Sequence, residues 1–106
     1  MAVLIIAEHN NLHLSDATKH LVTAAQQLGT DIHILVAGFD NQDAVTQATH
    51  LAGVTTILQA SNIAYKNQLA ENLAALIHAI ASDYNYIIAP ATTFGKNILP
   101  RVAALL

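Results

Sequence analysis

Four short runs of aliphatic residues alternate along the chain with longer stretches in which apolar residues recur every three or four positions. Runs of this length and composition are typical of strands buried on both faces of a parallel sheet. They predict strands at residues 2–8, 31–38, 54–60 and 86–89. The stretches between and after them have the period of amphipathic helices.

Single residues define the limits of two predicted helices. Ser15 is suited to cap the start of the first helix with its hydroxyl, and Gly29 is suited to end it. The longest polar connection covers residues 61–68. A third helix is expected to begin at about Leu69, directly after that connection.

The second and fourth helices are expected between residues 41 and 53 and between residues 94 and 106. Pro100 lies inside the fourth helix, where a proline removes a backbone hydrogen bond. The sequence therefore leaves two possibilities open for this helix. It either begins late, near Asn97, or bends at Asn97 and Ile98.

The alternation of strand and helix predicts the class of fold. Consecutive right-handed βαβ units form a parallel, Rossmann-like sheet with helices on both faces. We expect one α/β domain over residues 1–106, with about four βα units and the strand order 3-2-1-4. Because the chain stops within an apolar helical pattern, we expect it to be the front portion of a longer polypeptide.

The composition of the chain favours a protein that contacts a partner and argues against nucleic-acid binding and membrane insertion. The chain is 54% hydrophobic and 10% charged, which predicts that some apolar surface contacts a partner or a second copy of the chain. Its four basic residues are scattered and its net charge is -3, which argues against nucleic-acid binding. No stretch approaches the length of about 20 apolar residues that spans a bilayer, so no membrane insertion is expected. There is no cysteine, which excludes disulfides.

The candidate functional residues follow the predicted strands, because parallel α/β sheets bind ligands beyond the carboxyl ends of their strands. With the expected strand order, Glu8 and His9 face Thr92 and Thr93 across a crevice between strands one and four. Two hydroxyls, a helix start and Lys96 are suited to hold an anionic group. The spacing is not that of a P-loop. The competing interpretation is that a threonine caps the helix and that Lys96 points to water.

Six histidines raise the question of a metal site or an acid–base pair. No two of them lie four positions apart on a predicted helix, and no acidic residue accompanies them at ligand spacing, so no metal site is expected. His33 lies inside a predicted strand and is expected to be a hydrogen-bonded core residue. No nucleophile accompanies Glu8 and His9, so no catalytic residue is assigned. The residues themselves indicate a binding or docking module.

Several segments of the chain resemble the α subunit of electron transfer flavoprotein. They are AVLIIAEH, LVTAAQQLG, DIHILVAG, LAGV, LAENLAALI and APATTFGKNILPRVAALL, and they match in order from residue 2 to residue 106. The last of them is the most specific. The resemblance implies the N-terminal part of that subunit, with a fold of the adenine nucleotide alpha hydrolase-like type.

The resemblance also implies partners and a cofactor. In this family the α subunit pairs with a β subunit and carries electrons through FAD from acyl-CoA dehydrogenases and related enzymes to the respiratory chain, through a quinone-linked oxidoreductase. The FAD contacts lie mainly in a C-terminal domain outside residues 1–106, so no residue here is assigned to FAD and no catalysis is expected. The absence of an Arg- and Ser-rich leader favours the bacterial cytoplasm over the mitochondrial matrix.

A different reading of the residues is a stand-alone nucleotide-binding module. It would use the crevice between strands one and four, with Glu8, Thr92, Thr93 and Lys96 as the site. Measurable affinity for a nucleotide would separate this hypothesis from a structural role.

Overall fold

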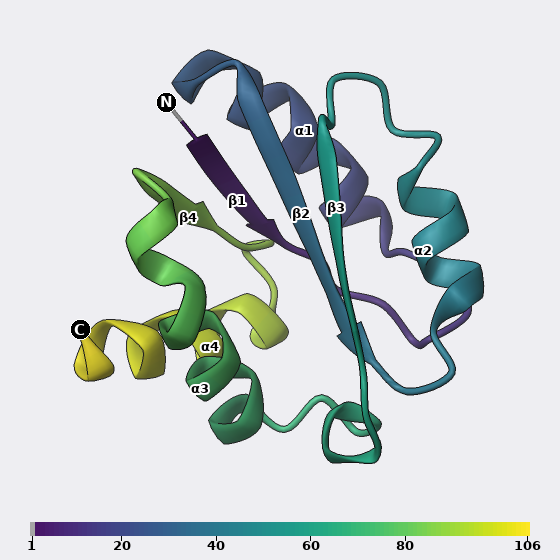
Figure 1. Ribbon diagram of the computed structural model, residues 1–106, viewed down its shortest axis with the longest axis vertical. Helices are drawn as coiled ribbons and strands as arrows, with labels where there is room; N and C mark the ends of the chain where they lie inside the picture. The colour runs from purple at the N-terminus through teal and green to yellow at the C-terminus, as the bar shows by residue number, and fades with distance from the viewer. Residues whose placement is uncertain (1) are drawn as a thin grey trace.

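A computed structural model describes residues 2–106 as a single parallel sheet covered by helices on both faces (Figure 1). The strands are β1 (Ala2–Ile6), β2 (Asp31–Gly38), β3 (Thr56–Ser61) and β4 (Tyr86–Ile88). The α-helices are α1 (Asp16–Leu28), α2 (Gln42–Ala48), α3 (Ala70–Ile80) and α4 (Thr93–Leu105), and two short 3-10 helices are η1 (Ile63–Tyr65) and η2 (Ala81–Asp83). The predicted α/β class is confirmed.

The strand order is β3-β2-β1-β4, as predicted, and all three pairings are parallel. Strand β1 lies inside the sheet, where Val3 pairs with Ile32 on one side and with Tyr86 on the other. The direction of the strand order changes at β1. This is the place at which open α/β sheets form their ligand crevices.

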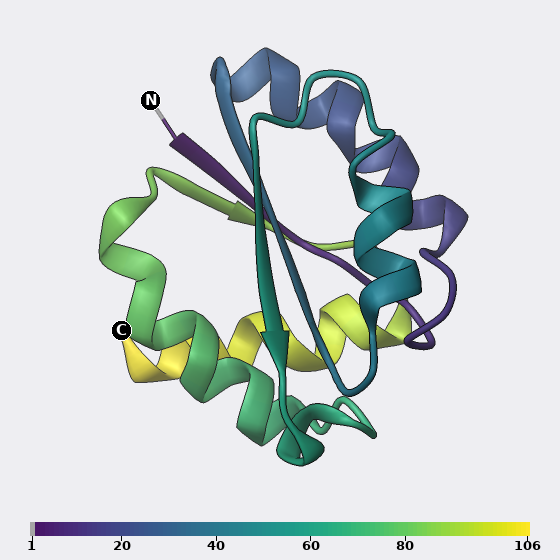
Figure 2. The same cartoon turned by 45° about the vertical axis from the view of Figure 1, so that its right-hand side comes forward.

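Two hydrophobic cores lie on opposite faces of the sheet, and Figures 1 and 2 show the helix pair that covers each face. Successive side chains of a strand point to opposite faces, so Val3 and Ile5 enter one core while Leu4 and Ile6 enter the other. This explains why the sequence of β1 is apolar without alternation.

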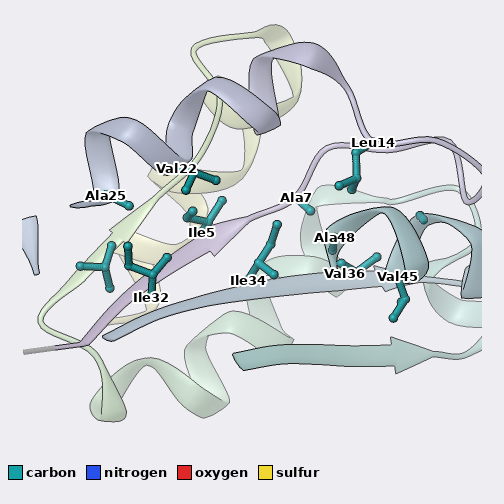
Figure 3. Close-up of a cluster of buried hydrophobic side chains, with 12 residues drawn as sticks. Ile5, Ala7, Leu14, Val22, Ala25, Ile32, Ile34, Val36, Val45 and Ala48 are labelled. Carbon is teal, nitrogen blue, oxygen red and sulfur yellow. The ribbon is translucent and has the colours of Figure 1, made fainter. Parts of the chain in front are cut away.

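Helices α1 and α2 cover the first core, drawn in Figure 3. Val22 of α1 and Val45 of α2 pack there with Ile34 of β2. Helices α3 and α4 cover the second core, to which Ile77 and Ile98 contribute fully buried side chains. Helices on both faces are thus confirmed.

Helix α1 starts as predicted, because the Ser15 hydroxyl accepts a hydrogen bond from the backbone N–H of Thr18. Gly29 follows the last helical residue, Leu28, and donates its N–H to the carbonyl of Ala25. Its φ of -176° is extended rather than left-handed, so glycine is not required there by backbone conformation.

Helix α2 is shorter than predicted, since it ends at Ala48 rather than at Gly53. Thr49 and His50 both direct side-chain donors to the carbonyl of Thr46. Such bonds compete with the backbone hydrogen bonds that would continue the helix. Turns then lead to Gly53, whose φ of 97° is left-handed and suits glycine.

Helix α4 begins at Thr93 and contains Pro100, so one of the two possibilities left open by the sequence, a late start near Asn97, is wrong. The N–H of Lys96 already donates to the carbonyl of Thr92 at 2.9 Å. Proline removes only the single bond that would run from position 100 to the Lys96 carbonyl. One missing bond is tolerated here because Ile98 and Val102 anchor the helix in the second core.

Candidate functional site

The crevice predicted between β1 and β4 brings Glu8 and Thr92 together. The Thr92 hydroxyl donates a hydrogen bond of 3.3 Å to the Glu8 carboxylate, across 84 residues of sequence. The backbone of Glu8 is also held in place, because its N–H donates a hydrogen bond of 2.8 Å to the Thr18 hydroxyl. Of the predicted arrangement, the contact of Glu8 with Thr92 is confirmed, whereas the ring of His9 bonds to Ala37 and Asn11 instead.

Thr93 and Lys96 lie in the first turn of α4 and are exposed. Thr92 takes the capping position but its side chain forms no capping hydrogen bond, since its hydroxyl is directed to Glu8. Within residues 2–106, Lys96 forms no ion pair. Neither of these two side chains forms a hydrogen bond or an ion pair with the Glu8 carboxylate, whose partner is Thr92.

The junction between β4 and α4 is closed by a backbone contact. A Cβ atom at Gly95 would lie 1.9 Å from the carbonyl oxygen of Pro90 and 3.3 Å from the Cβ of Ala89. Gly95 is therefore required for close packing of the helix start against the preceding loop. It does not frame a loop around a phosphate.

The chemistry of this edge is unfavourable for a phosphate group. The Glu8 carboxylate lies beside the Thr92 hydroxyl and would repel a phosphate placed there. The same carboxylate would repel the diphosphate of a cofactor such as FAD placed at this junction. Nucleotide binding through Glu8, Thr92, Thr93 and Lys96 stays a prediction.

A cleft of about 330 Å³ adjoins Glu8 on the side of the loop after β1. Its lining residues are Glu8, His9, Asn10, His13, Leu14 and Ser15. His9 and Leu14 are the buried members of this group, with 8% and 4% of their surfaces exposed. Burial lowers the pKa of His9 below its ordinary value of 6.5, and the hydrogen bond to the Ala37 carbonyl opposes that shift.

The loops after β1, β2 and β3 are tied together by polar side chains that the sequence analysis did not single out. Asn11, Asp40 and Gln68 lie in these loops with φ values of 72°, 50° and 52°. Left-handed backbone at residues other than glycine costs energy and is concentrated at sites that the surrounding structure holds in place. In the sequence, only Asn11 and Asp40 signal such a backbone among these three residues, because asparagine and aspartate tolerate this conformation better than most residues.

His33 is hydrogen-bonded as predicted, but it is half-buried and belongs to neither hydrophobic core, so its assignment as a core residue is wrong. Its Nε2–H donates to the Asp31 carboxylate at 3.1 Å, and its Nδ1 accepts from the Tyr84 hydroxyl at 2.7 Å. Hydrogen bonding from the Thr55 hydroxyl, followed by the charge and hydrogen bond of His33, lowers the pKa of Asp31. Among residues 2–106, no three histidine or carboxylate side chains form a group able to hold a metal ion.

The sheet order and the closed β4–α4 junction define a Rossmann-like α/β domain without a glycine-rich phosphate loop in residues 2–106. The sequence model of the electron transfer flavoprotein domain matches residues 3–106. The chain belongs to the electron transfer flavoprotein family.

Individual relatives are α subunits of that family. The electron transfer flavoprotein α subunits of Pseudomonas aeruginosa and Paracoccus denitrificans are 52% and 48% identical to the whole of this chain. The mitochondrial α subunit of Dictyostelium discoideum is 38% identical over 97% of it. The chain spans 34% of the length of the two bacterial relatives and 31% of the third. The family resemblance seen in the sequence is confirmed.

Proposed function

We propose that this chain is the N-terminal structural portion of an electron transfer flavoprotein α subunit. The observation that supports the proposal is the match to α subunits over the whole chain, at about a third of their length. The two separate cores give the domain a rigid sheet on which other parts of such a protein can be placed. Its role is to support electron transfer, and it is not itself a catalyst.

In the proposed protein, FAD is bound outside residues 1–106 and supplies the electron-accepting and electron-donating chemistry. The Glu8–Thr92 pair supports this assignment, because the Glu8 carboxylate would repel a diphosphate at the β4–α4 junction. The test is the intact mass and the visible absorption spectrum of the purified 106-residue chain. A colourless sample of the expected mass supports the proposal, whereas stoichiometric flavin would overturn it.

The proposed partners are the β subunit of electron transfer flavoprotein and, for the assembled protein, acyl-CoA dehydrogenases and a quinone-linked oxidoreductase. The support is the family to which the chain belongs. Co-expression of the chain, extended to the full α subunit, with a β subunit tests the first partner. Recovery of the two subunits in a 1:1 complex is the expected result, and failure of the folded subunits to associate would contradict it.

For the 106-residue chain alone, we propose self-association through the groove between α3 and α4. The groove has a volume of about 360 Å³ and a mainly apolar lining of Ala74, Ala75, Ala104 and Leu105. Glu71 and Arg101 also line it, with Arg101 Nη1 3.6 Å from Glu71 Oε1. One acid and one base in the same groove are self-complementary under two-fold symmetry, since each can face its opposite in a second copy.

The proposed location is the cytoplasm for a bacterial source and the mitochondrial matrix for a eukaryotic one. The relatives from Dictyostelium discoideum and Caenorhabditis elegans carry the word mitochondrial in their names. Within residues 2–106, none of the helices combines the length and the apolar character needed to cross a membrane. Fractionation of cells that express the full-length protein tests the assignment.

A further inference from the structure

The ring of His9 joins the loop after β1 to the end of β2 through its two nitrogens. The Nε2–H donates to the carbonyl oxygen of Ala37 at 2.8 Å, at the end of β2. The Nδ1 accepts the backbone N–H of Asn11 at 2.9 Å, in the loop that follows β1. A carbonyl can only accept and a backbone N–H can only donate, so these partners fix one neutral tautomer of the ring.

Asn11 extends this connection to two further loops. Its Oδ1 accepts the backbone N–H of Phe39 at 3.0 Å, and its Nδ2 donates to the carbonyl of Lys66 at 3.4 Å. A Cβ at Gly38 would lie 2.2 Å from the Asn11 Oδ1 and 2.8 Å from the His9 Cε1. The close approach of the two side chains to β2 therefore depends on glycine at position 38.

Gln68 provides a second link to the same histidine. Its Nε2 donates to the backbone carbonyl of His9 at 2.6 Å. The loops after β1, β2 and β3 consequently meet at His9 and Asn11, and two of the residues that bridge them, Asn11 and Gln68, have left-handed backbone. Residues held in such conformations depend on the bonds around them.

We propose that protonation of His9 is a conformational switch that releases Asn11 and uncouples the three loops at the carboxyl edge of the sheet. A proton on Nδ1 would face the Asn11 N–H across the 2.9 Å now spanned by a hydrogen bond. Two donors cannot share that space, so the bond is lost. Without that bond, the left-handed backbone of Asn11 loses the contact that stabilises it. The backbone then relaxes, and the side chain moves away from Phe39 and Lys66.

None of the charged or titratable groups described on the surrounding loops pairs with the His9 ring, so none would offset a positive charge on it. Glu8 and His13 line the same cleft, Asp40 follows Phe39 in the loop after β2, and Lys66 lies in the loop after β3. Within residues 2–106, none of their side chains forms a hydrogen bond or ion pair with the ring, and Glu8 accepts from Thr92 instead. Burial lowers the pKa of His9, which agrees with a ring that is neutral when the loops are joined.

The test is an NMR titration of the 106-residue chain between neutral and mildly acidic pH. The His9 ring signals report protonation, and the backbone amide signals of Asn11 and Phe39 report the two links. We expect all three to change with one midpoint, lower than the ordinary histidine pKa. Amide exchange at Phe39, corrected for the intrinsic effect of pH, should rise roughly five- to tenfold, as expected for the loss of about one hydrogen bond.

Two variants make the result decisive. Asn11→Gly keeps the backbone N–H and suits the left-handed φ, but it removes both side-chain links. In this variant the amide at position 11 should still follow His9, while Phe39 should no longer respond. His13→Gln changes an exposed histidine of the same loop and should leave the midpoint in place. Amides of Asn11 and Phe39 that ignore His9 titration, or a Phe39 response that persists in Asn11→Gly, would overturn the proposal.

Discussion

The Tyr84 hydroxyl donates a 2.7 Å hydrogen bond to the Nδ1 of His33, although β1 lies between the strands to which the two residues are attached. The two rings also meet edge to face, with centroids 5.2 Å apart. Asn85, the next residue, donates its N–H to the Ala2 carbonyl at 3.0 Å. The segment before β4 is therefore attached to both β1 and β2, which helps to hold a strand of only three residues at the edge of the sheet.

Replacing Tyr84 by phenylalanine should lower the free energy of unfolding by about 1 kcal/mol, because the half-buried Nδ1 of His33 loses its donor. Urea unfolding at neutral pH measures the change. Tyr86→Phe is the matched control, since Tyr86 is exposed and its hydroxyl has no hydrogen-bond partner among residues 2–106. Equal stabilities for the two variants would show that the Tyr84–His33 bond contributes nothing.

Gly95→Ala should destabilise the chain by about 3 kcal/mol, because the new methyl group would meet the Pro90 carbonyl and the backbone would have to move. Gly29→Ala should change the stability by less than about 1 kcal/mol, since Gly29 has extended backbone that alanine also adopts. Thermal unfolding followed by circular dichroism compares the two variants. A well-tolerated alanine at position 95 would contradict the close contact at this junction.

Stability should fall as the pH is lowered through the range below 6.5. Because burial lowers the native pKa of His9, the unfolded chain binds the proton more readily, and the free energy of unfolding rises with pH in this range. The contribution is complete above the unfolded pKa and is lost as the pH falls to the native one. Asp31, whose native pKa is also lowered, loses its contribution only at pH values below about 3.8.

Urea unfolding at pH 7.5 and at pH 5 measures the His9 effect. His9→Gln should reduce the difference between the two conditions, because the glutamine amide can still donate to the Ala37 carbonyl but does not titrate. His13→Gln should retain it. A difference of the same size in His9→Gln and in the unchanged chain would assign the pH dependence to another group.

The α3–α4 groove allows a charge-exchange experiment. Glu71→Arg leaves two bases in the groove, and Arg101→Glu leaves two acids, so each variant alone should be monomeric by light scattering. Mixed in equal amounts, the two should form a heterodimer, because every base then faces an acid of the other chain. Ala24→Glu, an exposed change on α1, serves as the control and should still dimerise. A monomeric unchanged chain at high concentration would remove the self-association proposal.

The sequence was sufficient to predict the strands, the parallel sheet and the strand order, because buried parallel strands need aliphatic residues on both faces. It also placed Glu8 and Thr92 at one edge, since parallel strands end together. The length of α2 was not predictable from apolar spacing alone. Thr49 and His50 end that helix through hydrogen bonds to one carbonyl, and residues of both types are also found inside helices.

The hydrogen bonds that join the loops could also not be predicted from the sequence. His9 and Ala37 are 28 positions apart, and Asn11 reaches Lys66 over 55 positions. Such bonds depend on the exact separation of loops after the sheet has formed, and no local period encodes that separation. In the sequence Gly38 was only the last residue of a predicted strand, while its structural role is to admit His9 and Asn11.

The central position of β1 has a consequence for biosynthesis. Val3 pairs with Tyr86, so 86 − 3 = 83 positions separate the partners on that side. At translation rates of about 5–20 residues per second, one edge of β1 stays unpaired for roughly 4–17 s after its own synthesis. During that interval the nascent chain exposes an aliphatic strand that is prone to pair with other chains. Protection by a ribosome-associated chaperone should therefore matter more for this domain than its small size suggests.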